Sequence, residues 1–150
     1  MARIYLTNGG FTLINDEDAL SVSKHRWFES QGYVYRSDMR PLLSLHRFLM
    51  NAGSGTVLDH INGNPLDNRR ENLRFCTEAQ NHYNRRLNKD NTSGFKGVWF
   101  RKTSKRWQAE IRVNGKKRRL GCFQSKEDAA KRYNEAAREH FGEFARLNLV

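Results

Sequence analysis

Four side chains in the middle of the chain have the types and spacing of a one-metal hydrolytic site. Asp59 and His60 are adjacent, Asn72 follows His60 by twelve residues, and Asn81 follows by nine more. Asp59 and Asn81 offer the hard oxygen ligands that Mg²⁺ prefers, which leaves its other positions to water and phosphate oxygens. His60 titrates near neutral pH and could take a proton from an attacking water. The set indicates metal-assisted hydrolysis of a phosphodiester.

The elements expected around these residues could bring them together. Residues 56–59 form a β-type run, residues 62–68 are dense in the Asn, Gly, Pro and Asp of a loop, and residues 72–76 can form a second short strand. Thr77 and Gln80 make a capping box, so a helix should begin there and place Asn81 in its first turns. The end of the first strand and the start of this helix can then face each other across a cleft.

The same residues resemble the three motifs of the HNH nucleases, in the homing-endonuclease branch with asparagine at the third position. The resemblance covers Leu45 to Arg86 and implies a ββα-metal module. It implies that His60 is the general base, that Asp59 and Asn81 bind the divalent metal, and that Asn72 orients the loop. It also implies Mg²⁺ as the cofactor, with Mn²⁺ as a substitute, and products with 5′-phosphate and 3′-hydroxyl ends.

Other interpretations of these residues stay open. An Asp-His pair before an Asn-Gly-rich loop can be turn chemistry, because Asn and Asp bond their own backbone. His82 and Asn84 compete with Asn81 for the third position, although the nine-residue spacing favours Asn81. We expect His46 to pack or to bond within a short helix rather than to act in catalysis.

Charge is concentrated in one segment of the 150-residue chain. The formal net charge is +11, and Arg85 to Arg119 contains thirteen basic residues against only Asp90 and Glu110. Such clustering is the electrostatic signature of a nucleic-acid partner, here double-stranded DNA. A solvated basic face is the weaker alternative. No apolar run is long enough to span a membrane and the N-terminus lacks a signal-peptide core, so we expect a cytoplasmic protein.

The basic segment also has the pattern of a three-stranded sheet followed by one helix. Residues 106–113 alternate with period two, Asn114-Gly115 is a strong hairpin signal, and residues 116–123 should return antiparallel with Leu120 and Cys122 inward. Residues 95–101 make a plausible third strand, and Ser125 begins a capping box before a helix with Ala129, Ala130 and Tyr133 on one face. The outer sheet face would then present a set of basic and aromatic side chains: Lys96, Trp99, Arg101, Arg112, Lys117 and Arg119.

This part of the chain resembles the plant Apetala/ethylene-response-factor (ERF) DNA-binding domain. The resemblance rests on residues 95–98, 107–112, 120–123 and 129–137, and it runs through Asn148. It implies that Lys96, Arg101, Arg112 and Lys117 read bases or hold phosphates. Trp99 stands where Arg is typical and Arg119 where Trp is typical, so the DNA site of the plant factors cannot be transferred to this chain.

We therefore expect an α+β protein with two modules. Residues 1–87 would form the HNH module with a β-rich N-terminal extension that begins with a hairpin, residues 88–93 a linker, and residues 94–150 the ERF-like domain. Cys76 and Cys122 are single and far apart, so no structural zinc or disulfide is expected.

The expected function is that of a site-specific, homing-type DNA endonuclease in a bacterial or phage-infected host cell. A monomer would nick one strand, whereas a dimer or two sequential nicks would break both. The alternatives are a non-cleaving, sequence-specific DNA-binding regulator and a nonspecific HNH nuclease whose basic domain only concentrates DNA.

Overall fold

Residues 1–81 and 82–150 form two separate units in the computed structural model, which describes residues 1–150. Each unit combines short helices with small antiparallel sheets, so the fold class is α+β, as the sequence predicts. Segment 88–93, the predicted linker, lies inside the second unit, where the side chains of Asn91 and Ser93 bind the carbonyl of Phe95. None of the helices has the length and apolar character needed to span a lipid bilayer.

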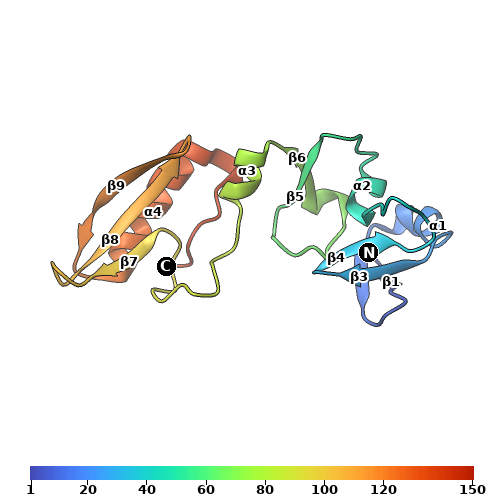
Figure 1. The fold of residues 1–150 in the computed structure, drawn as a ribbon, viewed down its shortest axis with the longest axis horizontal. Coiled ribbons are helices and arrows are strands. Elements are labelled where there is room, and N and C mark those ends of the chain that lie inside the picture. The colour runs from blue at the N-terminus through green and yellow to red at the C-terminus, as the bar shows by residue number, and fades with distance from the viewer. The chain divides into compact units, whose positions relative to one another are not determined.

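The N-terminal part of the first unit consists of two hairpins and three short helical segments (Figure 1). Strands β1 (Ala2–Tyr5) and β2 (Phe11–Ile14) pair antiparallel, which confirms the predicted hairpin. A 3₁₀ turn, η1 (Asp16–Asp18), leads into α1 (Ala19–Val22). The second hairpin, β3 (Trp27–Ser30) with β4 (Tyr33–Arg36), was not predicted as strands. Helix α2 (Leu45–Leu49) contains His46, as expected.

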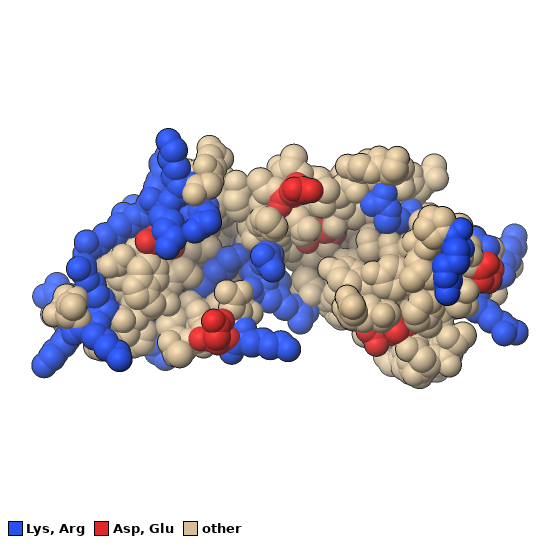
Figure 2. All heavy atoms as spheres, in the orientation of Figure 1, with Lys and Arg blue, Asp and Glu red and all other residues tan.

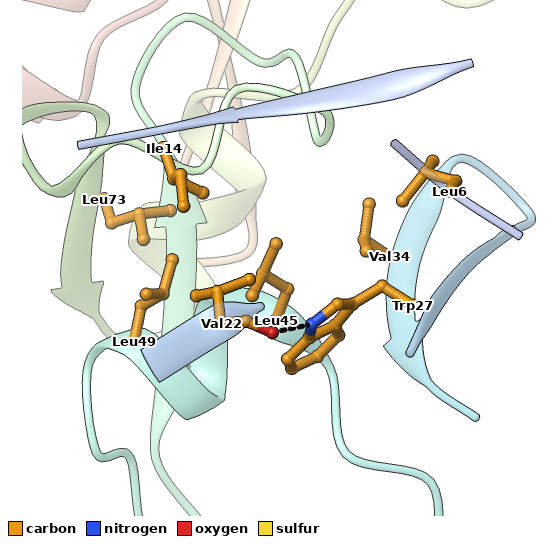
Figure 3. Packing of buried hydrophobic residues seen from close by; sticks show 8 residues of the cluster. All are labelled: Leu6, Ile14, Val22, Trp27, Val34, Leu45, Leu49 and Leu73. Atoms are coloured by element: carbon orange, nitrogen blue, oxygen red, sulfur yellow. Dashed lines mark hydrogen bonds between the residues drawn. The ribbon is translucent and has the colours of Figure 1, made fainter. Parts of the chain in front are cut away.

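One apolar cluster holds these elements together, and Trp27 lies in it (Figure 3). The cluster consists of Leu6, Ile14, Val22, Trp27, Val34, Leu45, Leu49 and Leu73. The Trp27 ring is 1% exposed, and its Nε1 donates to the carbonyl of Val22 at 2.9 Å, so its one polar atom is satisfied inside the core. Because Leu73 is the first residue of strand β6 (Leu73–Cys76), this core also fixes the strand pair that contains Asp59 and His60.

The strand, loop, strand, helix unit forms where the sequence predicts it. Strands β5 (Val57–His60) and β6 (Leu73–Cys76) pair antiparallel, a 3₁₀ turn, η2 (Arg70–Asn72), precedes β6, and α3 spans Glu78–Tyr83. The capping box is reciprocal: Thr77 N donates to Gln80 Oε1 at 2.8 Å, and Gln80 N donates to Thr77 Oγ1 at 3.2 Å. Two orphan backbone donors at the helix start are thereby satisfied.

The second unit is a three-stranded antiparallel sheet covered on one face by a helix (Figure 1). Its strands β7 (Val98–Arg101), β8 (Arg106–Val113) and β9 (Lys116–Phe123) lie in that order, and α4 (Lys126–Phe141) is followed by the 3₁₀ turn η3 (Gly142–Phe144). Asn114 and Gly115 have φ angles of 50° and 76°, which a two-residue hairpin of this type requires. Ser125 caps α4 by accepting from Asp128 N at 3.0 Å, as predicted.

Small residues allow the helix to approach this sheet closely. Ala129 and Ala130 of α4 are fully buried against Val98 and Ala109. Gly97 has a φ of 72°, and a Cβ there would lie 2.3 Å from the Tyr133 ring and 2.5 Å from the Glu110 carbonyl oxygen. Only glycine fits this place, because the backbone conformation and the available space both exclude a side chain.

Two predictions for the sheet were wrong. Cys122 was expected to point inward, but the register shifts between Ala109 and Glu110, so that Leu120 is the additional residue on β9. The bulge reverses the alternation: Leu120 still packs on the core, whereas Cys122 is paired with Gln108 on the opposite face. Lys96 was expected on the outer sheet face, but it lies before β7, and its Nζ donates to the backbone carbonyls of Tyr83 and Arg85.

Candidate active site and nucleic-acid interface

Asp59 lies in the β5–β6 pair directly opposite Arg74. Its carboxylate is 6% exposed, and Oδ2 accepts from Arg74 Nη2 at 2.8 Å and from Nε at 3.0 Å. Taking a carboxylate out of water is costly unless a charge or several hydrogen bonds compensate. The cross-strand guanidinium supplies that compensation and fixes the position of Asp59.

His60 is the last residue of β5, and its imidazole is held by polar and aromatic neighbours. The ring is 5% exposed, and its Nε2 lies 3.1 Å from Asn68 Oδ1. The His46 ring meets it edge to face with centroids 5.2 Å apart, and the Tyr33 ring lies 6.1 Å away. Since neighbouring residues of a strand point to opposite faces, Asp59 and His60 share the end of one strand without competing for space.

Burial lowers the pKa of His60, whereas the hydrogen bond that its Nε2 donates to Asn68 Oδ1 and the charges of Asp59 and Asp67 act in the opposite direction. It also lowers the pKa of His46 to about 4, with the charges of His60 and Arg47 as smaller causes. A neutral imidazole has a lone pair, so His60 is in the form that a general base needs at neutral pH.

Asn72 connects both ends of the loop that follows His60. Its Oδ1 accepts from Asn62 N at 2.9 Å, and its Nδ2 donates to the Asp67 carbonyl at 2.7 Å. Asp67 in turn accepts two hydrogen bonds from Arg69, both at 2.7 Å, and one from Asn62 Nδ2 at 2.8 Å. Asn72 is 6% exposed and Asp67 is 3% exposed. The loop is therefore braced from inside by side chains.

The N-terminal extension contacts this loop directly, and this contact was not predicted from the sequence. Leu13 of β2 exchanges backbone hydrogen bonds with the loop: its N donates to Leu66 O at 2.9 Å, and its O accepts from Asn68 N at 2.8 Å. Asp18 forms a two-bond ion pair with Arg70, at 2.7 and 2.9 Å. Residues more than fifty positions apart meet here, so no local pattern reports the contact.

Asn81 is half-buried on α3, where its N donates to Thr77 O at 3.0 Å. The hairpin brings Asp59, His60 and Asn72 into one small region, but no hydrogen bond joins Asn81 to Asp59 or His60. His82, the rival for the third position, is exposed on the same helix, and Asn84 is buried just after it.

The donor set of Asp59 and Asn81 fits a hard divalent ion rather than zinc. Both offer oxygen, and no group of three or more His, Cys, Asp and Glu side chains is placed to hold a metal ion. Water and phosphate oxygens would have to complete the coordination. A cation bound there would share the Asp59 carboxylate with Arg74.

The sheet of the second unit presents several basic residues on the face opposite α4. Strand pairing places Arg101 beside Arg106 and Arg112 beside Lys117, with Trp99 and Arg119 on the same face. We call this set the basic face; its members are Trp99, Arg101, Arg106, Arg112, Lys117 and Arg119. Figure 2 shows Lys and Arg side chains gathered over this unit. Arg106 was missed as a site residue, although it alternates with the inward Trp107 like the others.

One acidic residue lies within the basic face. Glu110 is paired with Arg119 in the strand register, and its Oε1 lies 3.6 Å from Lys117 Nζ. Arg119 Nη2 donates to Cys122 Sγ at 2.9 Å, which the bulge brings to this face. The remaining guanidinium groups extend outward from a rigid sheet, an arrangement that suits phosphates and base edges.

Comparisons with known proteins agree with the chemistry of the first unit. A model of the HNH endonuclease family matches residues 49–83, the segment from α2 to α3. A protein of Acanthamoeba polyphaga mimivirus named as an uncharacterized HNH endonuclease is 34% identical over 150 residues, which cover 95% of this chain and 76% of that protein. Protein 3.8 of Escherichia phage T7 is 36% identical over 93 residues, which cover 62% of this chain and 76% of that protein.

The chain belongs to the HNH endonuclease family. Proteins of this family are nucleases that act on DNA and generally use a divalent metal. The family model ends at residue 83, so it does not extend to the basic face. No solved structure matches the chain significantly.

Proposed function

We propose that this protein is a site-specific, homing-type endonuclease that hydrolyses phosphodiester bonds of double-stranded DNA. The observation that supports this most is the placement of His60: a buried imidazole that follows Asp59 at the end of a strand, inside the segment that matches the family. Burying a histidine and a carboxylate side by side costs free energy, and such groups are found together more often at functional sites than in purely structural positions.

The proposed roles follow from the surroundings of each residue. His60 takes a proton from the attacking water, and Asn72 keeps the loop after His60 in shape through its bonds to Asn62 and Asp67. Asp59 and Asn81 would hold the divalent ion, Mg²⁺ or in its place Mn²⁺. When bound, the ion would stabilise negative charge on the phosphate and on the leaving oxygen. Arg74 orients Asp59 through their ion pair.

The second unit is proposed to position the enzyme on its target as an ERF-like DNA-binding domain. Trp99, Arg101, Arg112, Lys117 and Arg119 share the face that α4 leaves uncovered, and a sheet of this kind can enter the major groove. Lys96 is tied to backbone carbonyls, so we expect it to support the fold of this unit more than to contact DNA.

The protein is expected to act as a monomer in the cytoplasm of a bacterial or virus-infected host. One site per chain nicks one strand, and a double-strand break requires a dimer or two successive nicks. The phage and mimivirus relatives fit such a host.

A nicking assay on supercoiled plasmid tests the enzyme, with Mg²⁺, Mn²⁺ or EDTA present. We expect metal-dependent nicking that His60→Ala reduces by about 10²- to 10⁴-fold, the usual contribution of a general base. His140→Ala is the matched control, because His140 lies on α4, outside the segment that matches the family. Equal activity of His60→Ala and the wild type would disprove the mechanism.

The two rival functions predict different products in the same assay. A DNA-binding regulator gives no nicking with either metal while it still retards DNA on a gel. A nonspecific nuclease cuts any sequence equally and loses activity steeply with salt. Sequencing the ends cut from a random-site library distinguishes a chosen site from indifferent cleavage.

A further inference from the structure

A buried chain of hydrogen bonds runs from His60 into the N-terminal extension. His60 Nε2 lies 3.1 Å from Asn68 Oδ1, and Asn68 Nδ2 donates to Thr12 Oγ1 at 2.9 Å and to Pro65 O at 3.0 Å. Thr12 Oγ1 donates to Leu66 O at 2.8 Å. Asn68 is 1% exposed and Thr12 is fully buried. Water therefore has no access to the groups that set the direction of this chain.

The backbone carbonyls of Pro65 and Leu66, at one end of this hydrogen-bond network, determine which atom donates in each of its bonds. Pro65 O and Leu66 O can only accept. The Thr12 hydroxyl uses its single proton on Leu66 O, so towards Asn68 it can only accept. The Asn68 amide must consequently turn its Nδ2 to Thr12 and Pro65, and its Oδ1 to His60. A flipped amide would place Oδ1 against two acceptors, Pro65 O among them.

This order leaves one role for the imidazole nitrogen that faces Asn68. An amide oxygen only accepts, so His60 Nε2 must bear the proton, and in a neutral ring the lone pair is then on Nδ1. The Tyr33 and His46 rings contact the imidazole through ring faces and edges, which restricts its tilt without choosing a tautomer.

We propose that Asn68 is a positioning residue that fixes His60 as the Nε2–H tautomer and so makes Nδ1 the atom that takes the proton from water. Thr12, on β2, fixes Asn68 in turn, which gives the N-terminal extension a part in the reaction. The inference rests on the proposed function for the role of His60 as base. The tautomer itself can be measured without any cleavage.

Nitrogen NMR of the histidine rings in the full-length, metal-free protein tests the tautomer at neutral pH. We expect His60, identified by the signals missing in His60→Ala, to show a protonated Nε2 and an unprotonated Nδ1. In Asn68→Ala the two nitrogen signals should move towards each other as the tautomers mix, while those of His140 on α4 stay unchanged. A wild-type ring protonated on Nδ1, or an unchanged tautomer in Asn68→Ala, would overturn the proposal.

Two Thr12 variants provide a matched test that does not alter Asn68. Thr12→Ser keeps the hydroxyl and should keep the tautomer, whereas Thr12→Val keeps the shape, removes the acceptor and should let the tautomers mix in part. If Asn68→Ala does not fold, this pair decides the question. Identical His60 spectra for the two variants would contradict the role of Thr12.

Cleavage kinetics then connect the tautomer to the reaction. We expect Asn68→Ala to lower kcat by about 10- to 100-fold with KM nearly unchanged, as for other residues that orient a reacting group. A loss of kcat in Asn68→Ala without a change of tautomer would refute the positioning role, whereas full activity of His60→Ala would refute only the proposed function.

Discussion

The two units of this chain differ in what they bury and in where their charge lies. Residues 1–81 contain nine basic and nine acidic residues, whereas residues 82–150 contain eighteen and seven. The first unit buries eight polar or charged side chains, among them Asp59, His60 and Asn68, and the second buries four. The first unit thus holds polar groups in its interior, and the second has an excess of positive charge that can attract a polyanion.

This difference determines which substitutions destabilise each unit. Every buried side-chain nitrogen and oxygen in the structure has a hydrogen-bond partner. Such networks are stable only when complete, so the first unit is sensitive to the loss of any member. The second unit depends instead on close contact between α4 and the sheet through Gly97 and alanines. The four predictions below test this contrast.

The largest effect on stability is expected at Gly97. Gly97→Ala must strain a backbone with φ of 72° and push a Cβ into the Tyr133 ring, so we expect a loss of about 3 kcal/mol or more in the free energy of unfolding. Gly94→Ala is the control: its φ is 80° but its surroundings are open, so only about 1 kcal/mol is expected. Equal losses in urea denaturation would show that packing space at Gly97 is unimportant.

Acid should weaken the first unit through its buried histidines. The pKa of His46 is about 4 in the folded protein, below the ordinary 6.5, so the unfolded state binds the proton first as pH falls. The contribution of neutral His46 to the free energy of unfolding is fully present above about pH 6.5 and is lost as the pH falls to about 4. The loss amounts to about 3 kcal/mol, because a pKa shift of one unit corresponds to about 1.4 kcal/mol.

Unfolding curves between pH 7.5 and 4 measure this loss. His46→Phe keeps a ring against His60 but cannot titrate, so its stability should fall less over the same interval. His140→Phe in the second unit should behave like the wild type. A His46→Phe protein with the full wild-type pH dependence would place the effect elsewhere.

Charge removal should weaken DNA binding only when it is made on the basic face. Arg112→Ala with Lys117→Ala should reduce the slope of log affinity against log salt by about 1.8, for two phosphate contacts. Lys24→Ala with Arg26→Ala removes the same charge from exposed positions of the first unit and should leave the slope nearly unchanged. Titrations at several salt concentrations measure both. Equal slopes in the two double variants would mean that net charge alone binds DNA.

The smallest effects should separate two basic residues within the second unit. Lys96→Ala leaves the carbonyls of Tyr83 and Arg85 without a donor and should cost about 1 kcal/mol of stability, with DNA affinity little changed. Arg101→Ala should weaken DNA binding by about threefold and leave stability unchanged, because Arg101 is exposed. Melting temperatures and DNA affinities of the two variants test this. Weaker DNA binding by Lys96→Ala with unchanged stability would show that Lys96 contacts DNA.

The features of the fold that the sequence predicts are those with local physical causes. The capping boxes at Thr77 and Ser125 and the Asn114-Gly115 hairpin each depend on residues within three positions. The side chains of β8 alternate between the α4 side and the outer face, as the period-two pattern predicts, although the outward Gln108 is also buried. Such signals are complete within a few residues, and they located the strand, loop, strand, helix unit around Asp59 and His60.

The features that were not predicted depend on distant or exceptional backbone geometry. In the sequence, Asn68 cannot be distinguished from the other asparagines of its loop. Its hydrogen bond to Thr12, fifty-six residues away, appears only in the folded structure. Lys96 leaves the sheet because Gly97 interrupts the strand with a positive φ. Cys122 changes face because of one additional residue at the bulge, which no alternation rule anticipates.

That bulge also decides how the basic face can be labelled or redesigned. Lys117 and Arg119 face outward before the bulge, and Cys122 faces outward after it. A library that mutates every second position of β9 from Lys117 onward would therefore change surface residues up to Arg119 but inward-facing residues, such as Phe123, after Leu120. Positions must therefore be counted separately on each side of Leu120. In a Cys76→Ser background, Cys122 becomes the single thiol, and a fluorophore attached to it next to Arg119 would report DNA arriving on this face.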